Sequence, residues 1–156
     1  MNRSPKVRAI LVGGSIAATL DIVFAITWAA INGRTPVWLL QTVATGLLGE
    51  SAYSGGVGTA VLGLAGHFAM SYGWAALFVA AASRLPVLVA KPAFAGPAFG
   101  ILVFFTMRLV VLPLSAFPYP VSFSQPGATY DLLSHMFFFG LPIALFAAKT
   151  VRSGVR

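Results

Sequence analysis

The chain has 156 residues, of which 58% are hydrophobic and only 8% are charged, and its mean hydropathy is +0.90. A soluble domain carries about 25% charged residues, so the polar residues here are too few to cover a water-facing surface. The net charge of +7 comes from basic residues that mostly flank apolar runs, which is typical of membrane proteins and argues against nucleic-acid binding. The absence of cysteine excludes disulfides and thiolate metal sites.

Four apolar runs are each long enough to cross a membrane as a helix. They cover residues 9–31, 57–82, 93–112 and 128–148. A helix rises about 1.5 Å per residue, so about 20 residues cross a hydrocarbon core of roughly 30 Å. We therefore predict an all-α fold, a four-helix transmembrane bundle that forms a single integral membrane domain over residues 1–156.

The structure of the segments between the apolar runs is predicted from their length and from the residues that favour turns and helix ends. Residues 1–8 form a short basic leader, and the run that follows is too long for the core of a signal peptide. Thr35 followed by Pro36 predicts a helix N-terminus. The helix over residues 36–48 is amphipathic and too short to span, so we predict a short interfacial helix between the first two spans, with a re-entrant segment as the alternative. Residues 114–127, with three prolines, are predicted to be an external loop.

Small residues indicate where helices contact each other. Gly96 and Gly100 form a GxxxG pair in the third run, which we interpret as packing within the chain. One narrow face of the second run is small and polar and is expected to pack on other helices. That face consists of Thr59, Gly63, His67 and Ser71.

Just before the second run lie three polar residues, Glu50, Tyr53 and Ser54. We predict that Ser54 caps the second helix and that Tyr53 anchors it at the membrane interface. A gate or a headgroup contact at the outer mouth is the alternative interpretation.

The distribution of basic residues predicts the topology. With four spans, only Arg34 falls in the loops on one side, whereas eight basic residues fall on the other. Those eight are Arg3, Lys6, Arg8, Arg84, Lys91, Lys149, Arg152 and Arg156. Since basic loops stay in the cytoplasm, both termini are predicted to be cytoplasmic.

Each of the four runs carries one ionisable residue near the same depth. These residues are Asp21, His67, Arg108 and His135. Measured from the basic residue at the cytoplasmic end of its own run, each lies at a height of roughly 20–26 Å. We therefore predict a buried polar layer in the outer half of the bundle.

The unfavourable burial of charged groups predicts which side chains of the polar layer pair with each other. A charged group in hydrocarbon costs about 2.5–3.5 kcal/mol, so we predict an ion pair between Asp21 and Arg108. Asp131 lies four residues before His135 and is predicted to hold its ring. Thr59 and Ser71 are predicted to support the layer from the second helix.

Several roles for this layer stay open. It can be a structural pair that fixes helix register, or a site for a proton, an ion, a small solute or a lipid headgroup. His67 and His135 are candidate ligands for a haem or a metal, and a zinc site would need Asp21 or Asp131 as a further ligand. No catalytic residue is predicted, because hydrolase, zinc-protease and phosphate-loop motifs are absent.

Several short stretches together resemble a group of small, uncharacterised bacterial four-span inner-membrane proteins. The stretches are residues 49–56, 63–68, 110–115, 134–135 and 140–142. The resemblance extends over nearly the whole chain. It implies a bacterial inner membrane and a role for the two histidines, and it implies no substrate.

Taken together, the sequence favours a small bacterial inner-membrane protein that acts as a transporter- or channel-like module or as an accessory subunit of a larger membrane complex. A haem- or metal-binding electron-transfer subunit and a membrane enzyme acting on lipids are the alternatives. The expected partners are the lipid bilayer and either other membrane subunits or a second copy of the chain, and no nucleic acid is expected. Substrate and oligomeric state stay open.

Overall fold

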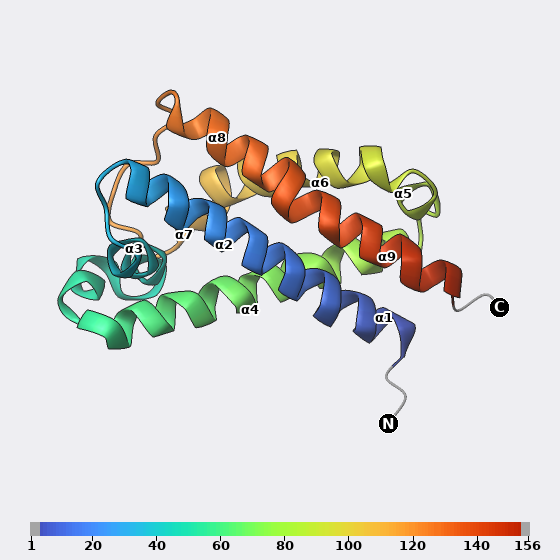
Figure 1. Ribbon diagram of the computed structural model, residues 1–156, viewed down its shortest axis with the longest axis horizontal. Helices are drawn as coiled ribbons and strands as arrows, with labels where there is room; N and C mark the ends of the chain where they lie inside the picture. The colour runs from blue at the N-terminus through green and yellow to red at the C-terminus, as the bar shows by residue number, and fades with distance from the viewer. Residues whose placement is uncertain (1–3, 154–156) are drawn as a thin grey trace.

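The structure, a computed structural model, describes residues 4–153, and over this range it is helical with no strands. Four long helical segments lie side by side (Figure 1). They are long and apolar enough to cross a membrane and cover Pro5–Ile31, Gly56–Ala82, Pro92–Leu114 and Gly127–Thr150. These bounds match the four predicted runs within a few residues at most ends, so the all-helical architecture with four long apolar helices is confirmed.

The first long segment consists of α1 (Pro5–Arg8), the π-helical turn η1 (Ala9–Gly13) and α2 (Gly14–Ile31). The helix begins at Pro5, inside the basic leader and four residues before the predicted span of residues 9–31. The reason is local: the Ser4 side chain accepts a hydrogen bond from the Val7 amide at 3.4 Å, and Pro5 occupies the first helical position.

The other elements follow in chain order. They are α3 (Pro36–Leu48), the 3₁₀ segment η2 (Gly49–Ser54), α4 (Gly56–Ala82), α5 (Val87–Ala90), α6 (Pro92–Thr106), the π-helical turn η3 (Met107–Val111), α7 (Leu112–Leu114), α8 (Gly127–Ser134), the π-helical turn η4 (His135–Gly140) and α9 (Leu141–Ser153). The third long segment is therefore α6–η3–α7, and the fourth is α8–η4–α9. Pro113 and Pro142 each follow a π-helical turn closely, because the wider turn relieves the clash between the proline ring and the preceding carbonyl group, which proline, without an amide hydrogen, cannot bond.

Helix α3 has the predicted bounds and runs across the long helices. The Thr35 hydroxyl accepts a hydrogen bond from the Trp38 amide at 3.1 Å, which caps the helix as predicted. Figure 1 looks nearly along α3, whereas the long helices lie across the view. A Cβ on Gly63 of α4 would lie 1.9 Å from the Leu40 carbonyl oxygen, so the backbones of α3 and α4 are in direct contact.

Both ends of the described chain lie at the same end of the molecule, together with α5, while α3 and the start of α8 lie at the opposite end (Figure 1). The basic residues of the terminal end are Lys6, Arg8, Arg84, Lys91 and Lys149, and Arg34 lies at the α3 end. Of the other basic residues counted above, Arg3 and Arg156 lie outside the described residues, and only the backbone of Arg152 is described.

The core is built from alanine, branched aliphatic and aromatic side chains of all four long segments. It includes Ala17, Ala75, Phe78, Val79, Val103, Phe139, Ile143, Ala144 and Ala147. A Cβ on Gly100 would lie 2.0 Å from the His135 carbonyl oxygen, and one on Gly96 would lie 2.5 Å from the Leu141 Cα. The GxxxG pair therefore brings two helices of the same chain into backbone contact, as predicted.

Candidate functional site

A polar cluster joins three of the long segments at the end nearer α3. Its members are Asp21 of α2, Arg108 of η3, Asp131 and Ser134 of α8, and His135, the first residue of η4. Arg108 Nη2 donates to Asp131 Oδ2 at 2.7 Å, and His135 Nδ1 lies 3.2 Å from Asp131 Oδ1. The Ser134 hydroxyl donates to Asp21 Oδ1 at 2.6 Å. The cluster thus connects the first, third and fourth long segments.

Helical spacing explains why these side chains meet. Asp131, Ser134 and His135 are three and four residues apart, so they share one face of the fourth segment. Arg108 and His135 both lie in π-helical turns, which are found frequently at functional sites. The close contact at Gly100 brings α6, and with it η3, against the backbone at His135.

Aromatic rings enclose the charged groups on one side. The Arg108 guanidinium lies 4.9 Å from the centre of the Phe104 ring and 5.5 Å from that of Phe123. The His135 ring packs edge-on against Phe104, with 5.8 Å between ring centres. Arg108 also donates to the Ser122 carbonyl oxygen. Side-chain exposure is 19% for Arg108 and 16% for His135, so the guanidinium and the imidazole are largely withdrawn from the surface.

The predicted ion pair between Asp21 and Arg108 was wrong. Arg108 pairs with Asp131, which was predicted to hold the His135 ring or to serve as a further zinc ligand. Asp21 accepts from Ser134 instead, and it lies close enough to His135 to interact with it electrostatically. The height of a residue along its helix gives its depth in the membrane but not the side of the helix on which it lies. The heights therefore did not show which carboxylate the Arg108 guanidinium faces.

His67 lies outside this cluster, between α2 and α4. Its Nε2 lies 2.9 Å from the carbonyl oxygen of Ala18, which is one turn from Asp21 on α2. Ser71, buried, donates to the His67 carbonyl oxygen at 2.7 Å. Closer to the end of the molecule that carries the termini, the hydroxyls of Tyr72 on α4 and Ser15 on α2 lie 2.8 Å apart. The small polar face of the second helix therefore packs on a neighbouring helix, and we call Ser15, His67, Ser71 and Tyr72 the α2–α4 polar contacts.

Thr59 belongs to a separate joint between α3, η2 and α4. Its hydroxyl donates to the Ala52 carbonyl oxygen at 2.6 Å. Gln41, which is buried, donates to the Gly56 carbonyl oxygen at 3.0 Å. Gln41 was not among the predicted site residues, although an amide side chain four residues before Thr45 on the buried face of an amphipathic helix is a signal for such a contact.

The predicted cap at Ser54 was wrong. The Ser54 hydroxyl donates to the Ser51 carbonyl oxygen at 2.8 Å, and Gly55 occupies the N-cap position of α4 without a side-chain bond. The cause is the 3₁₀ segment η2, which ends at Ser54 and directs its side chain toward the carbonyl group three residues earlier. Tyr53 stacks on Trp38, with 6.0 Å between ring centres.

The metal and haem interpretations receive no further support from the geometry. Within residues 4–153, no three His, Cys, Asp or Glu side chains gather closely enough to hold a metal ion. His67 contacts the α2 backbone and His135 contacts Asp131, so each ring already uses one nitrogen within the chain. A shared cofactor of the two histidines stays a prediction.

Four long apolar helices indicate a multi-pass membrane protein. Comparison of the chain with family models, with curated proteins and with solved structures found no match. The resemblance to small bacterial four-span membrane proteins therefore stays a prediction.

Proposed function

We propose that the protein is a channel-like module that moves protons across a bacterial inner membrane. The observation that carries this proposal is the charge of the polar cluster. Asp21 and Asp131 supply two carboxylates, whereas Arg108 supplies one guanidinium. One negative charge is therefore left over, in a part of the chain that is apolar enough to span a membrane.

An unbalanced charge in hydrocarbon is unfavourable, and ionisable residues inside spans commonly form proton relays. His135 contacts Asp131 and interacts with Asp21, so a proton on its ring makes the cluster neutral. Loss of that proton restores the negative charge. The cluster therefore has two states that differ by one proton, which is the minimum requirement for a proton-transfer site.

Further polar groups continue from the cluster toward the end that carries the termini. Asp21 is one turn from the Ala18 carbonyl that His67 contacts, and the pair formed by Tyr72 and Ser15 follows. From Asp21 to Ser15 the α2 axis advances about 9 Å. Imidazole and hydroxyl groups both donate and accept protons, so these contacts supply the inner part of a proton path.

The orientation is part of the same proposal. The basic residues gather at the terminal end, which favours cytoplasmic termini and an outward-facing polar cluster. Helix α3 runs across the long helices and is amphipathic, so it lies along the outer membrane interface as an interfacial helix.

Proton flux into liposomes tests the proposal. The purified full chain is reconstituted with a pH-sensitive dye inside, and a potassium gradient with valinomycin sets the membrane potential. We expect the wild-type chain to acidify the lumen faster than empty liposomes do. Asp21→Asn and His135→Gln should reduce that flux about tenfold or more, because His135→Gln removes the ring that takes up the proton and Asp21→Asn removes the negative charge that attracts it.

The matched control is Glu50→Gln, which neutralises the carboxylate of η2 outside the cluster and should keep the wild-type flux. Flux from wild-type protein equal to that of empty liposomes would show that the protein does not conduct protons by itself. In that case the cluster only joins helices, as expected of an accessory subunit of a larger complex.

A further inference from the structure

A group of polar side chains at the α3 end of the molecule is not part of the polar cluster described above. It consists of Glu50 and Tyr53 of η2 and Tyr119 of the loop that follows α7. A 3₁₀ helix has three residues per turn, so Glu50 and Tyr53 lie on the same side of η2. We call Glu50, Tyr53 and Tyr119 the Glu50 cluster.

Backbone contacts hold the loop that carries Tyr119 against the end of α3. The Ala116 amide donates to the Gly46 carbonyl oxygen at 3.0 Å, and a Cβ on Gly49 would lie 3.5 Å from the Ala116 carbonyl oxygen. Tyr119 thereby lies close enough to the other two members of the cluster to interact with them electrostatically. Desolvation raises the pKa of the Tyr119 hydroxyl above its usual range, and those two members raise it further, so Tyr119 stays protonated and uncharged.

The aromatic rings around the cluster already contact one another or a cation within the chain. The Tyr53 ring stacks on Trp38, and the Arg34 guanidinium lies 4.6 Å from the centre of the Trp38 ring. The Tyr119 ring packs edge-on with Phe117, with 5.6 Å between ring centres. A quaternary ammonium ion binds chiefly through aromatic faces, so these contacts do not favour one as a ligand.

The hydrogen bonds of the cluster leave it with oxygen acceptors. Thr42 Oγ1 donates its single hydrogen to the Trp38 carbonyl oxygen at 2.9 Å. The Tyr53 hydroxyl lies 3.1 Å from the same Oγ1 and is therefore the donor in that bond, which leaves the Tyr53 oxygen as an acceptor. The ionised Glu50 carboxylate can only accept. The cluster therefore suits a ligand that carries several N–H donors.

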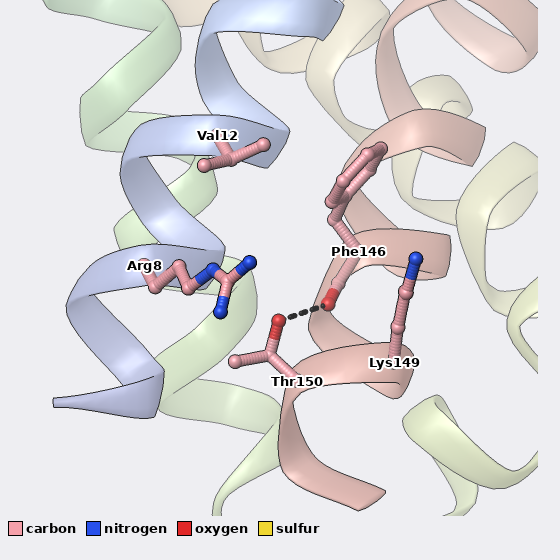
Figure 2. Close-up of a pocket in the computed structure, with 5 residues that line it drawn as sticks. All are labelled: Arg8, Val12, Phe146, Lys149 and Thr150. Atoms are coloured by element: carbon pink, nitrogen blue, oxygen red, sulfur yellow. Dashed lines mark hydrogen bonds between the residues drawn. The ribbon is translucent and has the colours of Figure 1, made fainter. Parts of the chain in front are cut away.

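The two ends of the molecule differ in charge. The terminal end carries most of the basic residues, and Arg8 and Lys149 line a small cavity there (Figure 2). At the opposite end, the basic residue is Arg34, whose guanidinium contacts an indole ring. Within residues 4–150, Glu50 forms no ion pair with a basic side chain. The negative charge of Glu50 therefore favours a cation from outside the chain.

We propose that the Glu50 cluster binds the primary ammonium group of a phosphatidylethanolamine headgroup. A primary ammonium has three N–H donors, which match the Glu50 carboxylate and the Tyr53 and Tyr119 oxygens. This inference rests on the interfacial position proposed for α3, which places the cluster at the level of the headgroups, and not on proton transfer. Free ethanolamine carries the same ammonium group and is the other source of this chemistry.

Native mass spectrometry of the full chain in detergent tests the proposal without a proton gradient, so its result does not depend on proton flux. The protein is titrated with phosphatidylethanolamine or with phosphatidylcholine that has the same acyl chains. The two headgroups have the same charges, but only phosphatidylethanolamine has N–H donors on its nitrogen. We expect phosphatidylethanolamine to bind about fivefold more tightly, because an ion pair at an exposed site contributes little.

Two variants locate the source of this preference. Glu50→Gln should reduce it to about twofold or less, because the amide carries no charge. Glu50 is exposed, so this replacement should leave the fold intact. The matched control Arg34→Gln removes the other charge at the same end and should keep the wild-type preference, because both lipids carry the phosphate that a guanidinium would bind.

The remaining outcomes contradict the proposal. Equal binding of the two lipids to wild-type protein would show that the ammonium N–H groups are not recognised. A preference that survives Glu50→Gln, or that Arg34→Gln lowers equally, would show that the Glu50 carboxylate is not its source. Displacement of phosphatidylethanolamine by an excess of free ethanolamine would show a site for a soluble amine in place of a lipid site.

Discussion

The ion pair between Arg108 and Asp131 makes a quantitative prediction about stability. The two groups lie 2.7 Å apart, and their side chains are 19% and 39% exposed. Breaking a fully buried pair by removing one partner costs about 3–5 kcal/mol, whereas an exposed pair contributes less than about 1 kcal/mol. Since this pair is partly exposed, we expect Asp131→Ala to lower the free energy of unfolding by about 2–3 kcal/mol.

A double-mutant cycle separates this pair from the pair that the sequence suggested. The free energy of unfolding is measured in mixed micelles by tryptophan fluorescence during titration with a denaturing detergent. Arg108→Leu combined with Asp131→Ala should recover part of the loss of each single variant, by about 1–3 kcal/mol. Arg108→Leu combined with Asp21→Ala should be closer to additive, because Asp21 bonds Ser134. Strong coupling of Arg108 to Asp21 together with none to Asp131 would refute this reasoning.

Two further predictions concern packing and topology. Gly100→Ala should destabilise the protein by about 1–3 kcal/mol, because the added Cβ would lie 2.0 Å from the His135 carbonyl oxygen. The control variant Gly66→Ala, whose added Cβ meets open space, should be neutral or slightly stabilising. The free energy of unfolding of both variants is measured by the same detergent titration. Reporter fusions after Ser153 and within the loop at residues 115–126 should report opposite sides of the membrane, and the same side for both would contradict four crossings.

The long helices were predictable because their determinants are local. Four apolar runs with Pro, Gly or basic residues between them leave few other arrangements, and Thr35 followed by Pro36 marks the start of α3 correctly. The start of the first helix at Pro5 was missed because charge was given more weight than the cap that Ser4 provides.

The partners of the buried groups were less predictable, since they depend on the rotation of each helix about its axis. Depth placed Asp21, Arg108 and His135 together, and these three do belong to one cluster. Depth did not show that His67 faces the Ala18 carbonyl. The π-helical turns at Arg108 and His135 change that rotation locally, and although a proline follows each turn closely, the size of the change in rotation is not given by the residue pattern.

The order of the two charges along the chain has a consequence for biosynthesis. Arg108 precedes its partner Asp131 by 23 residues, so the ribosome delivers the cation before the anion. Until the last helix emerges, the third one carries an unpaired guanidinium that disfavours its release into lipid by about 2.5–3.5 kcal/mol. The last two helices are therefore expected to leave the insertion machinery as a hairpin, with the charges already neutralised against each other.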